Sequence, residues 1–424
     1  MNNQVNWKRR FMNVGATVSR RRFLGGTLAA TAASAFSPLN ILAADNLSAP
    51  ASLTGVKRKI KLGIVGLGGR GSWIAGLFQQ HGGYEFHAVA DYFQTVADFK
   101  GESLGVDKAR RFSGLSGYEK VIESGVEAMV IIDVPYFFPE QSRAAVDAGL
   151  HVYMAKPVAV DVPGALAIRA GANLATQKQR VFFVDYQIPT DPVNQEVAQR
   201  IQEGGLGKLT QVQTMGFSAG HDDPPKTATI ESRLQHLVWD NDIALGGDFI
   251  GNFDIHAIDA ALWVIGQIPV SAMGASRICR PDPHGDSHDV CSVIYEYADG
   301  LVHNHFGQAL RDNSDGTLAA NFHGPEANAQ ITYWGKAFVR GGPKHYGGGK
   351  VENLYTAGAV RNIATFYQNV TAGRFENQTV PRAVDGVLTC VLGREAAARH
   401  AKMTMAELLK QNKKLEVDLT GLKA

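Results

Sequence analysis

Short apolar runs alternate with longer stretches of helical spacing along the first half of the chain, from residue 57 onward. The runs that predict buried strands lie at 60–65, 85–90, 126–132, 151–154 and 181–186. Between them, stretches such as 140–148 and 161–177 carry apolar residues at the spacing of a helix. Strands that alternate with helices form a parallel sheet covered on both faces. We therefore expect an α/β domain with a doubly wound, Rossmann-type parallel sheet over residues 57–187.

The pattern changes after residue 187. Asp191 followed by Pro192 predicts the start of a helix that ends near Gly204. Strand-like alternation then recurs at 210–219, 270–279, 289–297 and 301–308. Asp299-Gly300 joins the last two runs and is a strong hairpin signal, which implies antiparallel neighbours. We expect a C-terminal α+β domain over residues 188–424, with a mainly antiparallel open sheet and terminal helices at 388–400 and 405–410.

Two segments of this second half carry no predicted element. The glycine-rich stretch 341–349 is expected to be either a mobile flap or an exposed linker. The residues after 410 are expected to form a peripheral tail.

The first 44 residues differ in composition from the rest of the chain. They contain six Lys or Arg and no Asp or Glu. Ser19-Arg20-Arg21-Arg22-Phe23-Leu24 is followed by a weakly apolar run, which is shorter than the about 20 residues that span a bilayer. This layout resembles a twin-arginine export signal. It predicts a partner, the twin-arginine translocase, and a periplasmic location; a basic tail without a targeting role is the alternative.

Charge and cysteine content narrow the function further. The whole chain has 42 Lys and Arg against 40 Asp and Glu, but without the first 44 residues it has 36 against 40, a formal charge of −4. A mildly acidic body argues against nucleic acid as a partner. The three cysteines, Cys279, Cys291 and Cys390, are irregularly spaced, so we predict neither a disulfide framework nor a metal site.

A glycine-rich turn follows the first predicted strand and opens a helix. Gly66-Leu67-Gly68-Gly69-Arg70-Gly71 has the spacing and context of a dinucleotide-binding loop. Asp91 ends the second strand, 20 residues after Gly71, where a carboxylate would bind the adenosine ribose hydroxyls and repel a 2′-phosphate. NAD is therefore the predicted cofactor. Arg70 keeps NADP as a minority alternative, because a guanidinium is the usual partner of that phosphate.

Ligands of open parallel sheets bind at the carboxyl ends of the strands. Four further residues lie at that edge after strands in the chain, and we assign them to the cofactor site with the glycine loop and Asp91. They are Val134, Pro135, Lys156 and Gln187.

Taken together, the glycine loop, Asp91, the strand-end Lys156-Pro157 and the later Gly246-Gly247…His256-x-x-Asp259 segment resemble the Gfo/Idh/MocA family. The resemblance covers essentially the whole chain after the export signal. It implies NAD(P)-dependent oxidation of sugars or related polyols, a catalytic role for Lys156, and a dimer or tetramer formed through the outer face of the C-terminal sheet.

The chain departs from the family pattern at three places. Ala155 stands where the family has Glu before Lys-Pro, and the segment 134–139 reads Val-Pro-Tyr-Phe-Phe-Pro instead of a polar loop. Asn252 replaces the carboxylate four residues before His256. On a continuous helix Asn252 and His256 would share a face. Since an amide cannot act as a base, we expect His256 to remove the substrate proton and Lys156 to stabilise the alkoxide, with Asn252 as the third member of the catalytic site.

These features predict an exported, NAD-dependent oxidoreductase that removes a hydride from a C–OH group of a sugar ring. An exported enzyme has no free nicotinamide pool, so we expect the NAD to be tightly bound and recycled. The same logic supports an alternative, a redox-neutral glycosidase in which transient oxidation permits elimination of the aglycone. A non-catalytic sugar or dinucleotide sensor is a second alternative, against which the retention of Lys156 and His256 argues.

Overall fold

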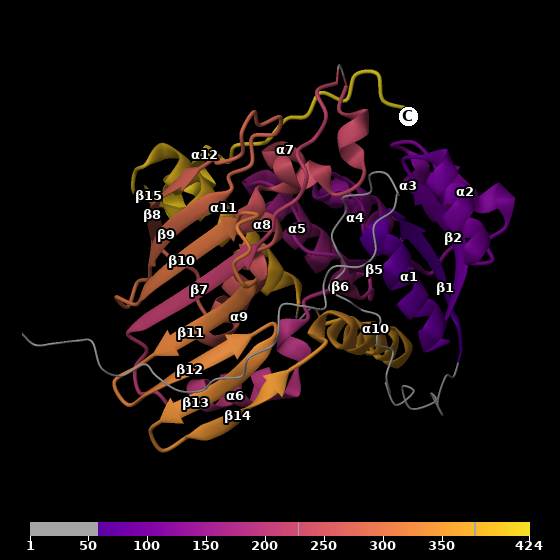
Figure 1. The fold of residues 1–424 in the computed structure, drawn as a ribbon. Coiled ribbons are helices and arrows are strands. Elements are labelled where there is room, and N and C mark those ends of the chain that lie inside the picture. Colours follow the sequence, from indigo (N-terminus) through magenta and orange to yellow (C-terminus); the bar gives the residue numbers. More distant parts are fainter. Residues whose placement is uncertain (1–57, 228, 377–378) are drawn as a thin grey trace, which may run out of the picture. The chain divides into compact units, whose positions relative to one another are not determined.

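The computed structural model describes residues 58–227, 229–376 and 379–424. The predicted export signal, residues 1–44, lies outside the described residues. The expected fold class is confirmed, with a parallel sheet followed by a larger, mainly antiparallel one (Figure 1).

The first sheet has six strands in the order β3-β2-β1-β4-β5-β6, and all neighbouring strands are parallel. Its strands are β1 (Ile60–Val65), β2 (Tyr84–Asp91), β3 (Arg111–Ser113), β4 (Ala128–Ile131), β5 (His151–Met154) and β6 (Phe182–Val184). The central strands β4 and β5 are buried at every position, and β1 at every position except Lys61, as their mainly apolar sequences require. The chain order reverses between β1 and β4, which is where doubly wound sheets bind ligands.

Helices cover both faces of this sheet. They are α1 (Gly69–His81), α2 (Gln94–Ser103), α3 (Gly117–Glu123), α4 (Phe138–Asp147) and α5 (Val162–Gln177). One more helix comes from the C-terminal part of the chain: α10 (Leu354–Ala372) packs beside α1. Its residues Ile363 and Phe366 are buried with Ile64 and Phe78 in one apolar cluster. The chain therefore passes from the parallel-sheet half to the second half after residue 187 and returns to the first half with α10.

The second sheet has nine strands in the order β14-β13-β12-β11-β7-β10-β9-β8-β15. Its strands are β7 (Gln211–Ser218), β8 (Ser271–Arg277), β9 (Val290–Glu296), β10 (Val302–Ala309), β11 (Thr317–His323), β12 (Ala327–Thr332), β13 (Gly335–Gly341), β14 (Tyr346–Val351) and β15 (Met403–Thr404). Every neighbouring pair is antiparallel except β7 with β10. The predicted hairpin is confirmed, since Gly300 has a φ of 86° and its N–H donates to the Tyr297 carbonyl at 3.1 Å.

One face of the nine-stranded sheet packs against α6 (Pro192–Gln202), α9 (Ile255–Ile265) and α11 (Val380–Arg399). The other face carries large apolar side chains on neighbouring strands. Met273, Ile294 and Phe306 are 43%, 39% and 44% exposed. Met273 and Ile294 are directly paired across β8 and β9.

Two sequence expectations for the second half are wrong. The glycine-rich stretch 341–349 is neither flap nor linker, because Tyr346–Val351 forms β14, the edge strand that pairs with β13. From the sequence, the segment that starts at Gly246 is expected to open one helix that continues through Trp263, but the structure breaks it into α7 (Ile243–Gly246), α8 (Phe249–Asn252) and α9. The break precedes Asp254, whose carboxylate bonds to Nε2 of His305 in β10 at 2.9 Å.

Candidate active site

The glycine loop between β1 and α1 has the geometry of a dinucleotide cradle. Gly66 has a φ of 85°, and a Cβ there would lie 2.6 Å from the Asp133 nitrogen. A Cβ on Gly71 would lie 1.9 Å from the Gly66 oxygen, so the third glycine lets α1 pack tightly on β1. Gly68 and Gly69 have no neighbouring atom within 4 Å of an added Cβ. This space lies at the N-terminus of α1, where backbone N–H groups favour a phosphate.

Asp91 lies at the end of β2 and is fixed by the backbone on both sides. Its Oδ2 accepts from the Leu67 N–H at 2.8 Å, and its Oδ1 accepts from the Phe93 N–H at 3.0 Å. Burial raises the pKa of Asp91 above its ordinary value, while the two backbone donors oppose that shift. Each carboxylate oxygen has a second lone pair, which suits it to accept from ribose hydroxyls.

Arg70 does not lie where a 2′-phosphate of NADP would need it. Its guanidinium forms an ion pair with Asp185, which follows β6, and it stacks 5.4 Å from the ring centroid of Trp73. Because β6 and β2 lie on opposite sides of β1, the Arg70 side chain points away from Asp91. The ion pair with Asp185 speaks against Arg70 as the partner of a 2′-phosphate, and the minority alternative of NADP stays a prediction.

The other edge residues assigned to the cofactor site are nearly buried. Val134 is 3% exposed, and Pro135 begins η2 (Pro135–Phe137) after β4. Gln187 is 1% exposed and its Oε1 accepts from the Tyr333 hydroxyl at 3.1 Å. In the described part of the chain its Nε2 has no hydrogen-bond partner. A buried amide donor without a partner suits a carboxamide such as that of nicotinamide, so the residues present fit a bound dinucleotide.

Lys156 follows β5 and reaches across to the second half of the chain. Its Nζ donates a hydrogen bond to the main-chain oxygen of Asn252, the last residue of α8. Burial, together with the nearby Arg70, lowers the pKa of Lys156 to about 8, while Asp240 and Asp185 oppose that shift. The amine is therefore close to its protonation midpoint at physiological pH, as expected for a group that exchanges protons.

His256 lies in the first turn of α9, beyond the break that follows Asn252. It is 7% exposed, and its ring makes edge contacts with Tyr186 and Tyr333, with centroids 6.0 and 5.1 Å apart. Burial, with the positive charges of Lys156 and Arg70, lowers the pKa of His256 well below its ordinary value. The imidazole is therefore neutral at pH 7, with a free lone pair, but the same shift weakens it as a base, so proton removal by His256 stays a prediction. Within the described residues its Nδ1 has no partner.

Asn252 contributes to this arrangement differently from what its spacing suggested. The break before α9 means that Asn252 and His256 do not share the face of a continuous helix. It is the Asn252 carbonyl, and not its amide side chain, that contacts Lys156. Tyr333 links Gln187, which we assign to the cofactor site, with His256, the predicted base: its hydroxyl bonds to Gln187 and its ring packs on His256.

Several residues of the site were missed by sequence reasoning. Asp185 is fully buried and also accepts from Asn362 Nδ2 at 2.7 Å. The carboxyl end of β6 could have indicated Asp185, but Asn362 and Tyr333 belong to α10 and to the segment after β12, neither of which was predicted.

Asp240 is a second buried carboxylate whose charge acts on Lys156. It lies in η5 (Val238–Asn241), is 1% exposed, and its Oδ2 bonds to Nδ1 of His221 at 2.5 Å. Its Oδ1 is buried without a hydrogen-bond partner in the described part of the chain, and its charge raises the pKa of Lys156. The sequence of the loop 239–242 favours solvated charge over a role in binding sugar hydroxyls, and the burial of Asp240 contradicts the first of these two alternatives.

A buried cluster beneath the site holds groups of metal-ligand type. Asp254, Cys291 and His305 place one possible ligand atom each within 4.8 Å of one another. However, Asp254 and His305 bond directly to each other, and Nδ1 of His305 bonds to the Thr214 hydroxyl at 2.9 Å. These bonds use the groups within the protein, and the absence of a metal site stays a prediction.

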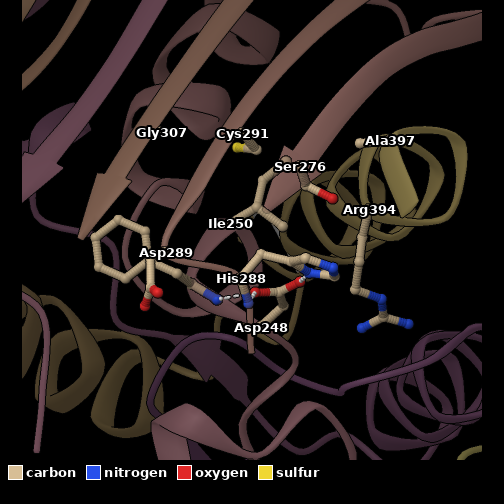
Figure 2. A pocket seen from close by; sticks show the side chains of 10 residues that line it. Asp248, Ile250, Ser276, His288, Asp289, Cys291, Gly307, Arg394 and Ala397 are labelled. Atoms are coloured by element: carbon tan, nitrogen blue, oxygen red, sulfur yellow. Dashed lines mark hydrogen bonds and ion pairs between the residues drawn. The ribbon is translucent and has the colours of Figure 1, made fainter. Parts of the chain in front are cut away.

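A small closed cavity lies beside this cluster (Figure 2). Asp248 and His288 line it, and Asp248 accepts from His288 Nδ1 at 2.7 Å. Its volume of about 10 Å³ has room for roughly one water molecule. Neither a sugar nor a dinucleotide fits there, so the cavity belongs to the packing behind α8.

Comparisons with known proteins agree with this geometry. Residues 194–326 match the model of the GFO/IDH/MocA C-terminal domain. An uncharacterised oxidoreductase of Synechocystis sp. is 24% identical over 198 residues, 46% of this chain and 50% of that protein, so the match spans about half of the relative.

Two solved structures share the fold over most of the chain. Aldose–aldose oxidoreductase from Caulobacter crescentus, complexed with glycerol, has a TM-score of 0.66 at 19% identity, covering 82% of this chain and 100% of that one. An inositol dehydrogenase homologue from Azotobacter vinelandii, complexed with NAD⁺, has a TM-score of 0.67 at 18% identity, covering 82% and 98%. With the domain match, these neighbours support the Gfo/Idh/MocA resemblance.

Among the described residues, none of the helices combines the length and apolar character needed to cross a membrane.

Proposed function

We propose that this protein is an NAD-dependent oxidoreductase that oxidises a ring hydroxyl of a sugar or sugar derivative. The observation that carries the proposal is that Lys156, after β5 of a sheet with a complete dinucleotide loop, bonds to the main-chain oxygen of Asn252, four residues before His256, and that its charge acts on the His256 imidazole. Structural neighbours that are sugar or polyol oxidoreductases, some with NAD(H) bound, support it.

The chain's own residues divide the reaction between them. The neutral His256 imidazole accepts the proton of the substrate hydroxyl. The Lys156 ammonium, oriented by the Asn252 carbonyl, stabilises the negative charge that develops on that oxygen. A bound NAD would supply the acceptor for the hydride of the carbinol carbon, whose alcohol would then be oxidised to a carbonyl. Tyr333 packs on the His256 ring and donates a hydrogen bond to Oε1 of Gln187. Tyr333 thereby fixes His256 relative to the Gln187 amide, which we assign to the cofactor site.

The proposal is tested with the purified protein. Denaturation should release NAD(H) that dialysis does not remove, and a panel of sugars should then reduce the bound NAD. This function would be excluded if the purified protein neither contained a dinucleotide nor bound one that was added.

A redox-neutral glycosidase is the second candidate, and the His221–Asp240 pair favours it. Such a cycle needs a proton donor for the departing aglycone besides the base that removes the hydroxyl proton. Asp240 is buried within electrostatic range of Lys156 and is bonded to His221. Release of the aglycone from aryl glycosides without net reduction of NAD would identify this activity, whereas net reduction without aglycone release identifies the oxidoreductase.

We further propose that residues 1–44 direct export through the twin-arginine translocase to the periplasm, and that NAD is tightly held for this reason. Signal-dependent export is tested by fusing these residues to a reporter. Replacing Arg20, Arg21 and Arg22 by Lys should retain the reporter in the cytoplasm, and unchanged export would contradict the proposal.

We also propose a homo-oligomer formed through the open face of the nine-stranded sheet. The exposed Met273, Ile294 and Phe306 form an apolar area there that a second copy would cover. The Ile294→Asp, Phe306→Asp double variant should be a monomer by light scattering. Phe99→Asp, at a 69% exposed position in α2, is the matched control and should leave the oligomer unchanged.

A further inference from the structure

The C-terminal tail, residues 412–424, returns from α12 (Met405–Gln411) to the parallel sheet. Figure 1 shows it as the yellow trace that leads away from α12 toward α2 and α3. Near its start the Leu415 N–H donates to Oδ2 of Asp161 at 2.8 Å. Near its end the Lys423 N–H donates to the Tyr92 hydroxyl at 3.1 Å. The tail stays on the surface, with most of its residues exposed, but these contacts hold it in place.

The contacts of the tail follow the carboxyl edge of the sheet from one side to the other. Asp161 lies beyond β5, Tyr92 follows β2 directly, and Leu115 follows β3, donating its N–H to the Lys423 carbonyl at 3.0 Å. Between these anchors Val417 and Leu419 pack in an apolar cluster. The tail thus spans the ends of strands β5, β4, β2 and β3.

The apolar cluster joins the tail to both halves of the molecule. Its buried members are Val134 and Phe137, from the segment after β4, and Leu245 of α7. Trp239 of η5, next to Asp240, packs against the same cluster. Burial of several apolar side chains holds such a segment more strongly than its few hydrogen bonds alone.

The tail leaves the groups that would hold the dinucleotide itself unoccupied. Within residues 58–227, 229–376 and 379–424 it forms no hydrogen bond with the glycine loop, and both Asp91 oxygens bond to backbone at Leu67 and Phe93. Tyr92, which anchors the tail, is the residue after Asp91. The tail therefore lies at the rim of the adenosine half of the site, and of the residues assigned to the cofactor it packs only in the apolar cluster that contains Val134.

We propose that residues 413–424 form a strap that closes over the adenosine half of the bound dinucleotide and slows its release. This inference rests on the proposed NAD-dependent function. The contacts that hold the strap are all made with the protein itself. Since in this proposal the strap covers the adenosine half, it has to detach before the adenosine leaves, and this opening limits the dissociation rate. A strap of this kind suits an enzyme whose NAD has to remain bound through many turnovers.

The strap is tested by deleting residues 413–424 and measuring NADH dissociation from the full-length and shortened proteins by stopped-flow fluorescence, with excess NAD⁺ as the competitor. We expect dissociation to become at least about tenfold faster, which corresponds to about 1.4 kcal/mol. Unchanged or slower dissociation would overturn the proposal. Tighter equilibrium binding by the shortened protein would also overturn it, because the tail would then compete with the dinucleotide.

Two point variants test the strap without the deletion, in case the shortened protein does not fold. Leu419→Ser weakens the apolar anchor, and Tyr92→Phe removes the acceptor of the Lys423 N–H, so each should accelerate NADH dissociation. Lys413→Ala, at an exposed position before the first anchor, is the matched control and should not. If the full-length protein binds no NAD(H), the proposed function fails. If it binds NADH but all strap variants release it at the original rate, only the strap fails.

Discussion

Lys156 donates a hydrogen bond from Nζ to the main-chain oxygen of Asn252 and thereby joins the two halves of the molecule at the candidate active site. Lys156 follows a strand of the parallel sheet, whereas Asn252 ends a short helix of the second half. The carbonyl acceptor orients the amine without adding a negative charge. The protonation of Lys156 is therefore set by burial and by the carboxylates and cations around it.

Replacing Lys156 by Met should lower kcat/KM for sugar oxidation by about 10²–10⁴-fold, the usual range for a positioned proton-transfer group. The loss arises because the developing alkoxide no longer meets a positive charge. NADH affinity, measured by fluorescence titration, should change much less than kcat/KM. Lys108→Met, an exposed lysine far along the chain from any predicted site residue, is the matched control. A wild-type rate in Lys156→Met would remove Lys156 from the mechanism.

The pH profile of kcat/KM should show an alkaline limb at about pH 8, because the pKa of Lys156 lies at about 8 and the ammonium is lost as pH rises through it. Asp240→Asn should move this limb to lower pH. The Asp240 carboxylate favours the charged amine, so its removal lowers the Lys156 pKa further.

The control for Asp240 is Asp222→Asn, which changes an exposed carboxylate paired with Arg311. The alkaline limb of kcat/KM in this variant should lie at the same pH as in the wild-type protein. A limb that stays in place in Asp240→Asn would show that Asp240 has only a structural role.

His256 should act as a neutral base over the whole physiological range. Burial holds its pKa well below the ordinary value of 6.5, so kcat/KM should show no acid limb near that pH. His256→Gln should lower kcat/KM by about 10²–10⁴-fold. The exposed His345→Gln is the control. A clear acid limb at the ordinary histidine pKa in the wild type would contradict the buried, neutral imidazole.

Gly68→Ala separates dinucleotide binding from folding. The added Cβ meets no protein atom within 4 Å, so thermal stability should change little. A bound pyrophosphate needs close approach to this backbone, so NADH affinity should fall about tenfold or more. Gly76→Ala, in α1 and equally free of neighbours, should keep both stability and affinity. Equal NADH affinities in the two variants would place the cofactor elsewhere.

The parallel-sheet half was largely predictable, because its site residues directly follow the apolar runs that predict its strands. The buried parallel strands read as unbroken apolar runs, and the functions of Gly66, Gly71 and Asp91 follow from their positions after strands. The Lys156 position followed for the same reason. The break before His256 was not predicted: Asp254 lies at the break and bonds to His305, 51 residues away, and the local sequence carries no sign of that contact.

Residues that come from distant elements were missed for a similar reason. Asn362 reaches Asp185 from α10, a helix that covers the first domain although it lies near the end of the chain. The contacts of the tail were also not predictable, since Val417 and Leu419 are too few apolar residues to indicate a packed segment. Their importance depends on the apolar surface around Val134 and Phe137, which only the fold assembles.

The most direct test of the account is hydride transfer from a sugar ring carbon to the bound cofactor. The purified protein is incubated with sugars deuterated at their carbinol carbons, then denatured, and the released NAD(H) is examined by mass spectrometry. We predict that the cofactor from the wild-type protein acquires deuterium with at least one sugar and that the cofactor from Lys156→Met does not. A protein that yields no NAD(H) and binds none when it is added would contradict the account.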